Sequence, residues 1–407
     1  LGAAANGPAW EAITPELVAR EDVPAAVTLG VVAFNVARAV GPALGGLLVA
    51  AFGSGPVFIL NAASFLGVLF VLYRWRRPVE KSNLPPEHVL GAMRAGVRYV
   101  RHTPALRAVL VRAAAFILCA SALWALLPLV ARRGLGLGAA GYGMLLGCLG
   151  LGAITGASFL PRVSRKISTN SLVVWATLIF AAVTVVLGCV RVATLVGASL
   201  FFGGVAWVAL LSTFNVAAQT EAASWVRARV LGVYMLAFFG GLACGSALWG
   251  WVAGRVGVSA ALLIAAAGLV AGLAAGVRFK LRRSERLDMT PSAHWPEPLV
   301  QAEPEVQTGP VLVTIEYRIN PEDARAFTEA ARALGETKQR DGAFYWNLFR
   351  DTADAARFVE ILIVDSWGEH RRQHGRLTEA DREVEERAQS FQLGGSPPKI
   401  SHLIAEP

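Results

Sequence analysis

The sequence is short of charged residues and of cysteine, and both shortages exclude classes of protein. Only 16% of the 407 residues are charged, whereas 55% are hydrophobic and the mean hydropathy is +0.50. A soluble domain usually carries about 25% charged residues and could not bury this much apolar surface. The four cysteines stand apart within apolar runs, without the paired spacing of a metal site or a disulfide framework. We therefore expect no metal and no cofactor.

Other signals are missing as well. The chain has no phosphate-cradling loop of the GxxxxGK[ST] type, which excludes an ATPase of that class. No basic stretch is interleaved with aromatic residues, so the net charge of +9 does not indicate nucleic-acid binding. No initiator Met precedes Leu1, and the opening apolar stretch is too short to span a bilayer. We expect that further helices precede this sequence.

What the sequence does have is a series of long apolar runs. Crossing a bilayer takes about 20 mostly apolar residues, and such runs occur at residues 24–50, 56–73, 106–130, 140–160, 171–190, 193–216, 230–253 and 259–279. They predict about eight membrane helices in a lipid bilayer. Lys and Arg gather in alternate loops and after residue 278. Because cytoplasmic loops carry this excess, those loops and the C-terminal tail are predicted to be cytoplasmic.

The connection between residues 74 and 104 has an amphipathic pattern. Its arginines are expected on one helix face and its valines on the other, with Arg94, Arg98 and Arg101 opposite Val97 and Val100. This pattern predicts a helix that either lies against the inner leaflet or serves only as a structural linker.

An internal repeat indicates two similar halves. The stretch GPALGGLLVAAFGSG from Gly41 aligns without a gap with GSALWGWVAGRVGVS from Gly245. The offset equals six spans with their loops, which predicts two six-helix halves of like orientation. The two stretches would then lie in the fifth and eleventh of twelve helices, and Leu1 in the fourth.

Polar residues inside the predicted spans are the candidate transport pathway. Arg38 lies near the middle of the span 24–50, where a charge must face protein, water or an anion, and Asn35 shares its helix face. A structural ion pair of Arg38 is the alternative. Asn61, Asn215 and Gln219 either line the pathway or bond helix to helix. Arg112, near a span end, is expected to extend its side chain to the interface.

Small residues follow Arg38 on the same span. Gly41, Gly45 and Gly46 would allow a neighbouring helix to approach closely, and Pro42 removes a backbone hydrogen bond. The motif predicts either a hinge for the rocking of one half against the other or ordinary tight packing.

These residues carry a resemblance to a known family. GPALGG after Ala37 and Arg38 resembles the fifth-helix motif of major facilitator exporters. The segments PELVARED, LNAASFLGVL and NVAAQTEAASWVRARVLGVYMLAFFGGLACGSALWG are similar to the enterobactin-exporter-like branch and to the transmembrane secretion effector group. The resemblance implies twelve helices, alternating access and proton-coupled export of a siderophore or drug-like small molecule from a bacterial inner membrane. The loop PRVSRKIST lacks the acidic residue of the superfamily's basic signature.

After residue 280 the composition changes to that of a linker and a soluble domain. We expect the membrane domain at 1–280, a linker at 281–309 and an α+β domain at 310–407. Val311–Ile319, Phe344–Phe349, Arg357–Val364 and Ile400–Ile404 have strand patterns, and helical spacing follows Ala324 and Thr378. The order βαββαβ predicts a ferredoxin-like fold, of a kind that commonly dimerises through its open sheet face.

This domain also resembles the antibiotic-biosynthesis monooxygenase-like fold, through SWGEHRRQH. A cofactorless oxygenase would need a polar pocket, for which the candidates are Tyr345, Trp346, Asn347, Trp367, His370 and His374. His370 and His374 are one helical turn apart, but no third metal ligand is near. Three functions stay open: ion-coupled export, an oxygenase or binding module for the transported compound, and a membrane sensor that transports nothing.

Overall fold

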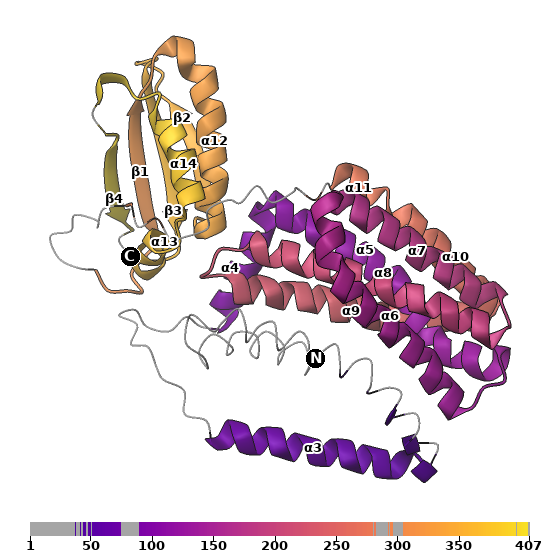
Figure 1. Ribbon diagram of the computed structural model, residues 1–407. Helices are drawn as coiled ribbons and strands as arrows, with labels where there is room; N and C mark the ends of the chain where they lie inside the picture. Colours follow the sequence, from indigo (N-terminus) through magenta and orange to yellow (C-terminus); the bar gives the residue numbers. More distant parts are fainter. Residues whose placement is uncertain are drawn as a thin grey trace. The chain divides into compact units, whose positions relative to one another are not determined.

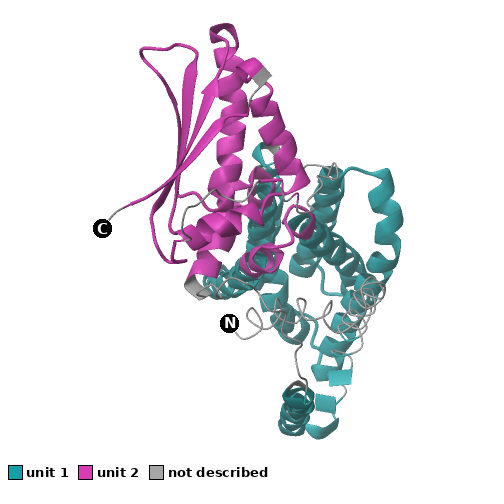
Figure 2. Cartoon of the chain, turned by 90° about the vertical axis from the view of Figure 1, so that its left-hand side faces the viewer, with its two compact units in different colours: residues 1–82, 108–218, 234–283 teal, residues 83–107, 219–233, 284–407 magenta. Residues whose placement is uncertain are grey.

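The computed structural model describes residues 51–74, 89–279, 304–395 and 397–405, and single positions 37, 41, 44, 45, 48, 49, 281, 292, 294 and 295. The chain forms two compact units, shown in two colours in Figure 2. The first comprises residues 1–82, 108–218 and 234–283; the second comprises residues 83–107, 219–233 and 284–407. The second unit therefore combines segments that are far apart in the sequence. A single boundary at residue 280 was expected. The second unit also includes two earlier segments that connect helices, residues 83–107 and 219–233.

Five helices in the described part of the chain are long and apolar enough to cross a membrane. They are α5 (Pro104–Leu129, continued by the π-helical turn η1, Val130–Gly134), α6 (Ala139–Lys166), α7 (Thr169–Cys189), α8 (Ala193–Thr220) and α9 (Arg227–Val256). Each coincides, within a few residues at either end, with one of the apolar runs predicted to span, so these five predictions are confirmed as membrane-length helices.

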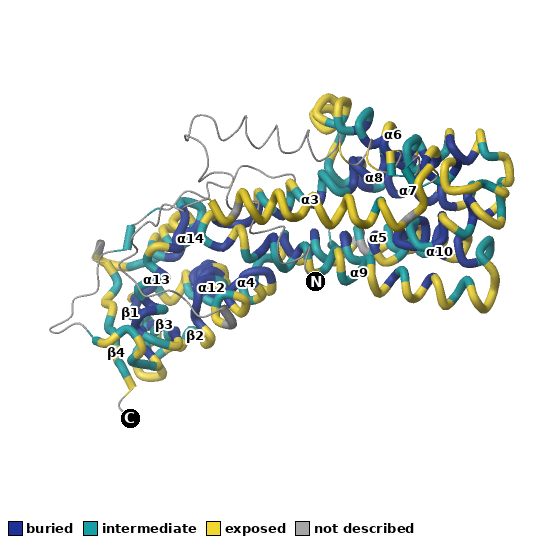
Figure 3. The backbone as a smooth tube through the Cα atoms, turned by 90° about the horizontal axis from the view of Figure 1, so that it is seen from below, coloured by how far each residue is buried: buried dark blue, intermediate teal, exposed yellow. Residues whose placement is uncertain are grey.

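The remaining predicted spans have different outcomes. The run at 56–73 forms α3 (Ser54–Arg74), whose described side chains are nearly all exposed along its length (Figure 3). The run at 259–279 is interrupted: α10 (Val258–Gly272) is followed by a turn and the short α11 (Ala275–Arg278). Leu273 and Ala274 bond to carbonyls three residues back, so the helix tightens and ends there. Most of the run at 24–50 lies outside the described residues.

Helices α6 and α8 pack with almost no space between their backbones. A Cβ atom at Gly152 of α6 would overlap the carbonyl oxygen of Phe201, and one at Gly204 of α8 would overlap the carbonyl oxygen of Leu149. Such close crossings through small residues are typical of membrane helices. Trp207 of α8 is buried beside this contact and lies 5.9 Å from the ring of Phe116 of α5.

The connection predicted to be amphipathic does form a helix, α4 (Val89–His102), but its buried face differs from the prediction. Tyr99 and Val100 are buried, whereas Val97 is 46% exposed. Arg98 lies on the protein side, where its side chain is only 20% exposed. The prediction of arginines opposite valines was therefore wrong for Arg98 and Val97, because α4 packs along α12 (Ala324–Asp341) of the same unit.

The C-terminal domain, residues 311–404, is a four-stranded antiparallel sheet with helices on one face (Figure 1). The strand order is β2 (Tyr345–Arg350), β3 (Arg357–Val364), β1 (Val311–Arg318) and β4 (Lys399–Ile404). Its helices are α12, α13 (Trp367–His374) and α14 (Glu379–Gln389), with short 3-10 turns at Pro321–Asp323 and Leu393–Gly395. The predicted element order occurs, and the predicted capping box of Thr378 and Asp381 opens α14.

Helix α13 was not predicted as an element, because its eight mostly polar residues show no apolar periodicity. Strand alternation sets the core beneath the helices. Val313 and Tyr317 of β1 and Leu362 of β3 point inward and are buried with Phe327 of α12. The sheet and α12 thus enclose one continuous apolar core, into which a few polar groups also project.

Candidate functional site

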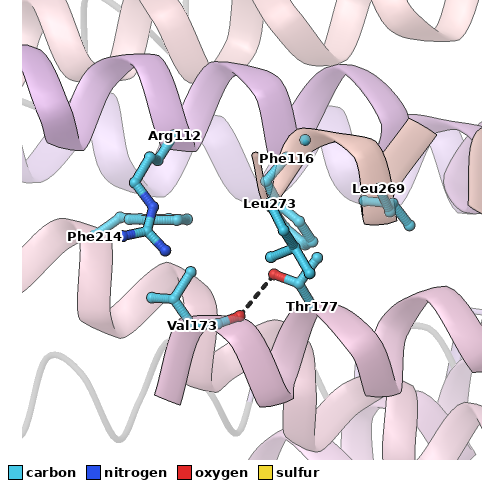
Figure 4. A pocket seen from close by; sticks show the side chains of 8 residues that line it. Arg112, Phe116, Val173, Thr177, Phe214, Leu269 and Leu273 are labelled. Carbon is cyan, nitrogen blue, oxygen red and sulfur yellow. Dashed lines mark hydrogen bonds between the residues drawn. The ribbon is translucent and has the colours of Figure 1, made fainter. Parts of the chain in front are cut away.

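A pocket in the helical bundle surrounds the guanidinium of Arg112 (Figure 4). It is small, with a cavity volume of about 20 Å³, and part of it is open to solvent. Its lining comes from four helices and the turn after α10: Arg112 and Phe116 of α5, Val173 and Thr177 of α7, Phe214 of α8, and Leu269, Gly272 and Leu273. Apolar side chains thus surround a single cation in this pocket.

Within the described part of the chain, the side chain of Asn170 holds Arg112 in place. Arg112 is only 5% exposed, and its Nη1 donates to Oδ1 of Asn170 at 2.5 Å. Asn170 in turn accepts from the backbone N–H of Leu281 at 3.1 Å and donates to the carbonyl of Leu281 at 2.6 Å. A Cβ at Gly276 would lie 3.3 Å from the guanidinium carbon, so glycine leaves room for it. Among the residues that the structure describes, no carboxylate pairs with Arg112.

Arg112 was expected to extend its side chain to the membrane interface. The side chain is buried among helices, and its polar partners lie at helix ends: Asn170 is the second residue of α7, and Leu281 follows α11. The side chain turns into the bundle because Asn170 and the apolar rings offer it a packed site. Sequence reasoning missed this residue because distance from the span end was the only signal used. Asn170, which follows the start of α7, could have been recognised as a polar partner.

The residues predicted to line the pathway are only partly within the described chain. Asn35, Arg38, Pro42 and Gly46 lie outside the described residues, and a Cβ at Gly41 or Gly45 meets nothing within 4 Å. Asn61 is exposed on α3, where its carbonyl accepts from Ser64. Asn215 and Gln219 are half-buried near the end of α8, and each has a polar interaction. These side chains are not brought together with Arg112 in the described part of the structure.

A second polar cluster lies inside the C-terminal domain. Glu360 of β3 is fully buried and accepts hydrogen bonds from Tyr317 Oη at 2.9 Å and from Trp346 Nε1 at 2.8 Å. Burial raises the pKa of Glu360, although Lys338 and the two hydrogen bonds oppose the rise. Lys338 of α12 is 2% exposed, with its Nζ 3.7 Å from Glu385 of α14.

The linker contributes to this cluster. Trp295 donates from Nε1 to Glu385 at 2.8 Å, and its ring centroid lies 3.6 Å from the Lys338 ammonium. His294 also contacts Glu385, at 3.3 Å. Burial would raise the pKa of Glu385, but Lys338, Trp295 and His294 hold it below its ordinary value. A position predicted to be linker thus belongs to the folded domain.

The predicted pocket of the C-terminal domain is split by the sheet. Trp346 points into the core with Trp367 and His370, and His374 lies 3.4 Å from His370 between their Nε2 atoms. Tyr345 and Asn347 alternate with Trp346 on β2, so they lie on the opposite, exposed face, where Asn347 donates to Tyr345. The six candidates therefore do not converge on one site. Among the described residues, no group of three His, Cys, Asp or Glu could hold a metal.

The buried histidine pair predicts acid sensitivity. Burial, followed by the charge of His374, lowers the pKa of His370 to about 3, and burial lowers that of His374 to about 4. In the unfolded chain, each histidine binds a proton below a pH of about 6.5. In the folded domain, His370 and His374 stay neutral at that pH. The free energy of unfolding is therefore unaffected by the two histidines above a pH of about 6.5, and it decreases as the pH falls towards 4. We expect the lowered pKa of His370 alone to reduce the free energy of unfolding of the domain by about 2 kcal/mol at pH 5.

Pulse proteolysis of the full-length protein in detergent, with cuts in residues 311–404 identified by mass spectrometry, measures this loss between pH 7.5 and 5. The pKa values of Glu369 and Glu385 are lowered, so their protonation acts below this range. His370→Gln should flatten the profile. The raised pKa of Glu360 acts in the opposite direction, so the comparison of the wild type with His370→Gln is decisive, and equal pH profiles of the two would contradict the assignment of a neutral, buried pair.

Comparisons with known proteins identify relatives of the chain. A family model described as transmembrane secretion effector matches residues 1–407. The chain is 27% identical over 299 residues to YfiS of Bacillus subtilis (strain 168), an uncharacterized MFS-type transporter, and the match covers 70% of each protein. A bacterial homolog of the human lysosomal transporter Spinster, in an inward-facing and unoccupied conformation, is similar with a TM-score of 0.43 and 14% identity. That match covers 66% of this chain and 71% of the other.

Proposed function

Because the chain belongs to the transmembrane secretion effector family, whose model matches all 407 residues, we propose that it is a secondary transporter that exports a small molecule. The relative described as an MFS-type transporter supports this proposal. The substrate would be a siderophore or a drug-like compound, and the membrane a bacterial plasma membrane. Two six-helix halves would expose the pathway alternately to each side.

The observation that carries this proposal is the buried cation of Arg112 at a pocket inside membrane-length helices. A charged side chain among apolar helices is costly, and it is kept where it meets a substrate, an ion or water. Phe116 and Phe214 beside Arg112 suit a compound with an apolar body and an anionic or polar group. Arg112 therefore joins Asn35, Arg38, Asn61, Asn215 and Gln219 as a proposed pathway residue.

The chain shows no Walker-type glycine loop, so we assign the driving force to an ion gradient, with the proton as the coupling ion. The motif of Gly41, Pro42, Gly45 and Gly46 would serve as the hinge of the first half. The excess of Lys and Arg in alternate loops supports a cytoplasmic position for the C-terminal domain.

We propose a ferredoxin-like fold for the C-terminal domain, and its antiparallel strand order supports this class. Its outer sheet face carries exposed Tyr345, Phe349 and Leu403, which favour pairing with a second copy. An oxygenase role has less support, because Tyr345 and Asn347 face away from His370 and His374.

Transport in reconstituted vesicles tests the proposal. Under an imposed pH gradient, full-length protein should move at least one member of a panel of siderophores and cationic drugs. Arg112→Gln should reduce that flux by about tenfold or more, because a charge contact worth about 1.4 kcal/mol is lost. Arg38→Ala should reduce it similarly. Arg133→Gln, an exposed arginine beyond the other end of α5, is the matched control. No flux of any probe, or equal flux in the Arg112 and Arg133 variants, would contradict the proposal.

A further inference from the structure

Helix α4 is bound to the C-terminal domain through a buried tyrosine. Tyr99 is 0% exposed, and the guanidinium carbon of Arg340 in α12 lies 5.1 Å from its ring centroid. On the other side, the Tyr99 hydroxyl accepts a hydrogen bond from the backbone N–H of Ala223 at 3.2 Å, and the ring meets Trp225 edge-on at 5.7 Å. One side chain of α4 thus touches both α12 and the α8–α9 connection, residues 221–226.

A partly buried ion-pair cluster joins α4 to α13 and reaches the α8–α9 connection at Trp225. Glu369 of α13 accepts from Arg98 of α4 at 3.0 Å and from Arg376 at 2.6 Å. Although burial opposes it, Arg376 and Arg98 hold the pKa of Glu369 below its ordinary value. The guanidinium of Arg376 also lies 4.4 Å from the ring of Trp225. The side chains of Arg98, Glu369 and Arg376 are 20%, 14% and 4% exposed, and breaking the cluster leaves a charge unpaired where solvent has little access.

The domain side of this contact is itself rigid. Arg340 donates to Asp341 at 2.8 Å and to Asp381 at 2.7 Å, which joins α12 to the start of α14. Arg376 donates to the carbonyl of Asp341 at 2.7 Å, which joins the end of α13 to α12. The surface that meets α4 is therefore held in shape by hydrogen bonds within the C-terminal domain.

Helix α4 also approaches the start of α9 closely. A Cβ atom at Gly96 would lie 2.9 Å from the Cβ of Arg229, so glycine permits the approach. The guanidinium of Arg229 lies 5.9 Å from the ring of Trp225. The contact surface of the C-terminal domain therefore has a defined partner, namely α4 together with the α8–α9 connection.

We propose that the C-terminal domain is a brace: it binds α4 and the α8–α9 connection and holds the adjoining ends of α5, α8 and α9 as one body during transport. Helix α4 leads through Thr103 directly into α5, and the connection joins α8 to α9. Alternating access is largely a rigid-body movement of one group of helices against another. If those helix ends moved independently, rocking would be less concerted and transport slower. The proposal rests on the proposed function for its effect on flux.

Two substitutions on α4 test the brace. Arg98→Glu places a carboxylate beside Glu369, whereas Arg101→Glu makes the same change at an exposed position of the same helix. Hydrogen–deuterium exchange of residues 89–102 in the full-length protein reports docking, and vesicle flux reports transport. For Arg98→Glu we expect exchange about tenfold faster or more and flux reduced by about fivefold or more. For Arg101→Glu we expect both values within about twofold of the wild type.

The two measurements separate the possible failures. Unchanged exchange in Arg98→Glu would show that the ion pair does not hold α4, and faster exchange with normal flux would show that docking has no part in transport. Either result overturns the brace. Absence of flux in the wild type would instead contradict the proposed function. The proposed role of the brace in transport would then be contradicted as well, and the exchange data would still show whether α4 is docked. Gly96→Val, which crowds Arg229, should reproduce the Arg98→Glu result if the domain itself stays folded.

Discussion

Replacing Gly204 by alanine is expected to separate α6 from α8 and to remove most of the folded helical bundle. The added methyl would overlap the carbonyl oxygen of Leu149 and crowd the backbone nitrogen of Ala153. Neither is the end of a flexible side chain, so the two helices would have to move apart. That movement would also disturb Trp207, which packs against Phe116 and Phe180. We expect a loss of about 3 kcal/mol or more, at the upper end of overpacking effects.

The matched control is Gly240→Ala in α9, where a Cβ meets nothing within 4 Å. Alanine is favoured over glycine in a helix by about 0.5–1 kcal/mol, so this control should be neutral or stabilising. Yield of monodisperse protein in detergent and its thermal unfolding temperature measure the difference. Equal stability of the two variants would show that α6 and α8 do not cross as closely as the structure has them. Gly152→Ala should behave as Gly204→Ala does, because it meets Phe201 from the other helix.

The sequence predicts the helices well because a membrane span needs only length and apolarity. These two properties place α5 to α9 within a few residues of their observed bounds. They say nothing about which neighbour a side chain meets. Arg112 shows the limit: its place in the chain favours the interface, whereas Asn170, 58 residues away, holds it inside the bundle. Pairings at that separation come from helix packing, which a single sequence does not encode as a local pattern.

In the C-terminal domain, too, the sequence pattern predicts the elements but not which side chains meet. Strand alternation predicts the sheet, and it also separates Tyr345 and Asn347 from Trp346, although the three residues are consecutive. The residues that do meet inside come from positions without a local signal. Trp295 lies in a predicted linker, and Lys338 and Glu385 lie on different helices. A charged residue on the inner face of an amphipathic helix is the signal that could have marked Lys338.

Replacing Lys338 by methionine is expected to destabilise the C-terminal domain by about 3–5 kcal/mol near pH 7.5, because it leaves carboxylates buried without their cation. Lys338 is 2% exposed, and Glu360 is fully buried. Methionine fills a similar volume, so the cost reports charge more than packing. The contact of the ammonium with the ring of Trp295 is lost as well. Lys399→Met, on the exposed side of β4, is the control and should change stability by less than about 0.5 kcal/mol.

The pH dependence of this variant distinguishes charge from packing. Burial already raises the pKa of Glu360, and removal of Lys338 removes the charge that opposes the rise. A carboxyl with a raised pKa in the folded state binds its proton more readily there than in the unfolded chain, so its penalty shrinks as the pH falls. The cost of Lys338→Met should therefore be smaller at pH 5 than at pH 7.5, and Lys338→Met/Glu360→Gln should recover part of the stability at pH 7.5. Pulse proteolysis within residues 311–404 measures both effects. A cost that is the same at the two pH values and unaffected by Glu360→Gln would mean that Lys338 acts through packing alone.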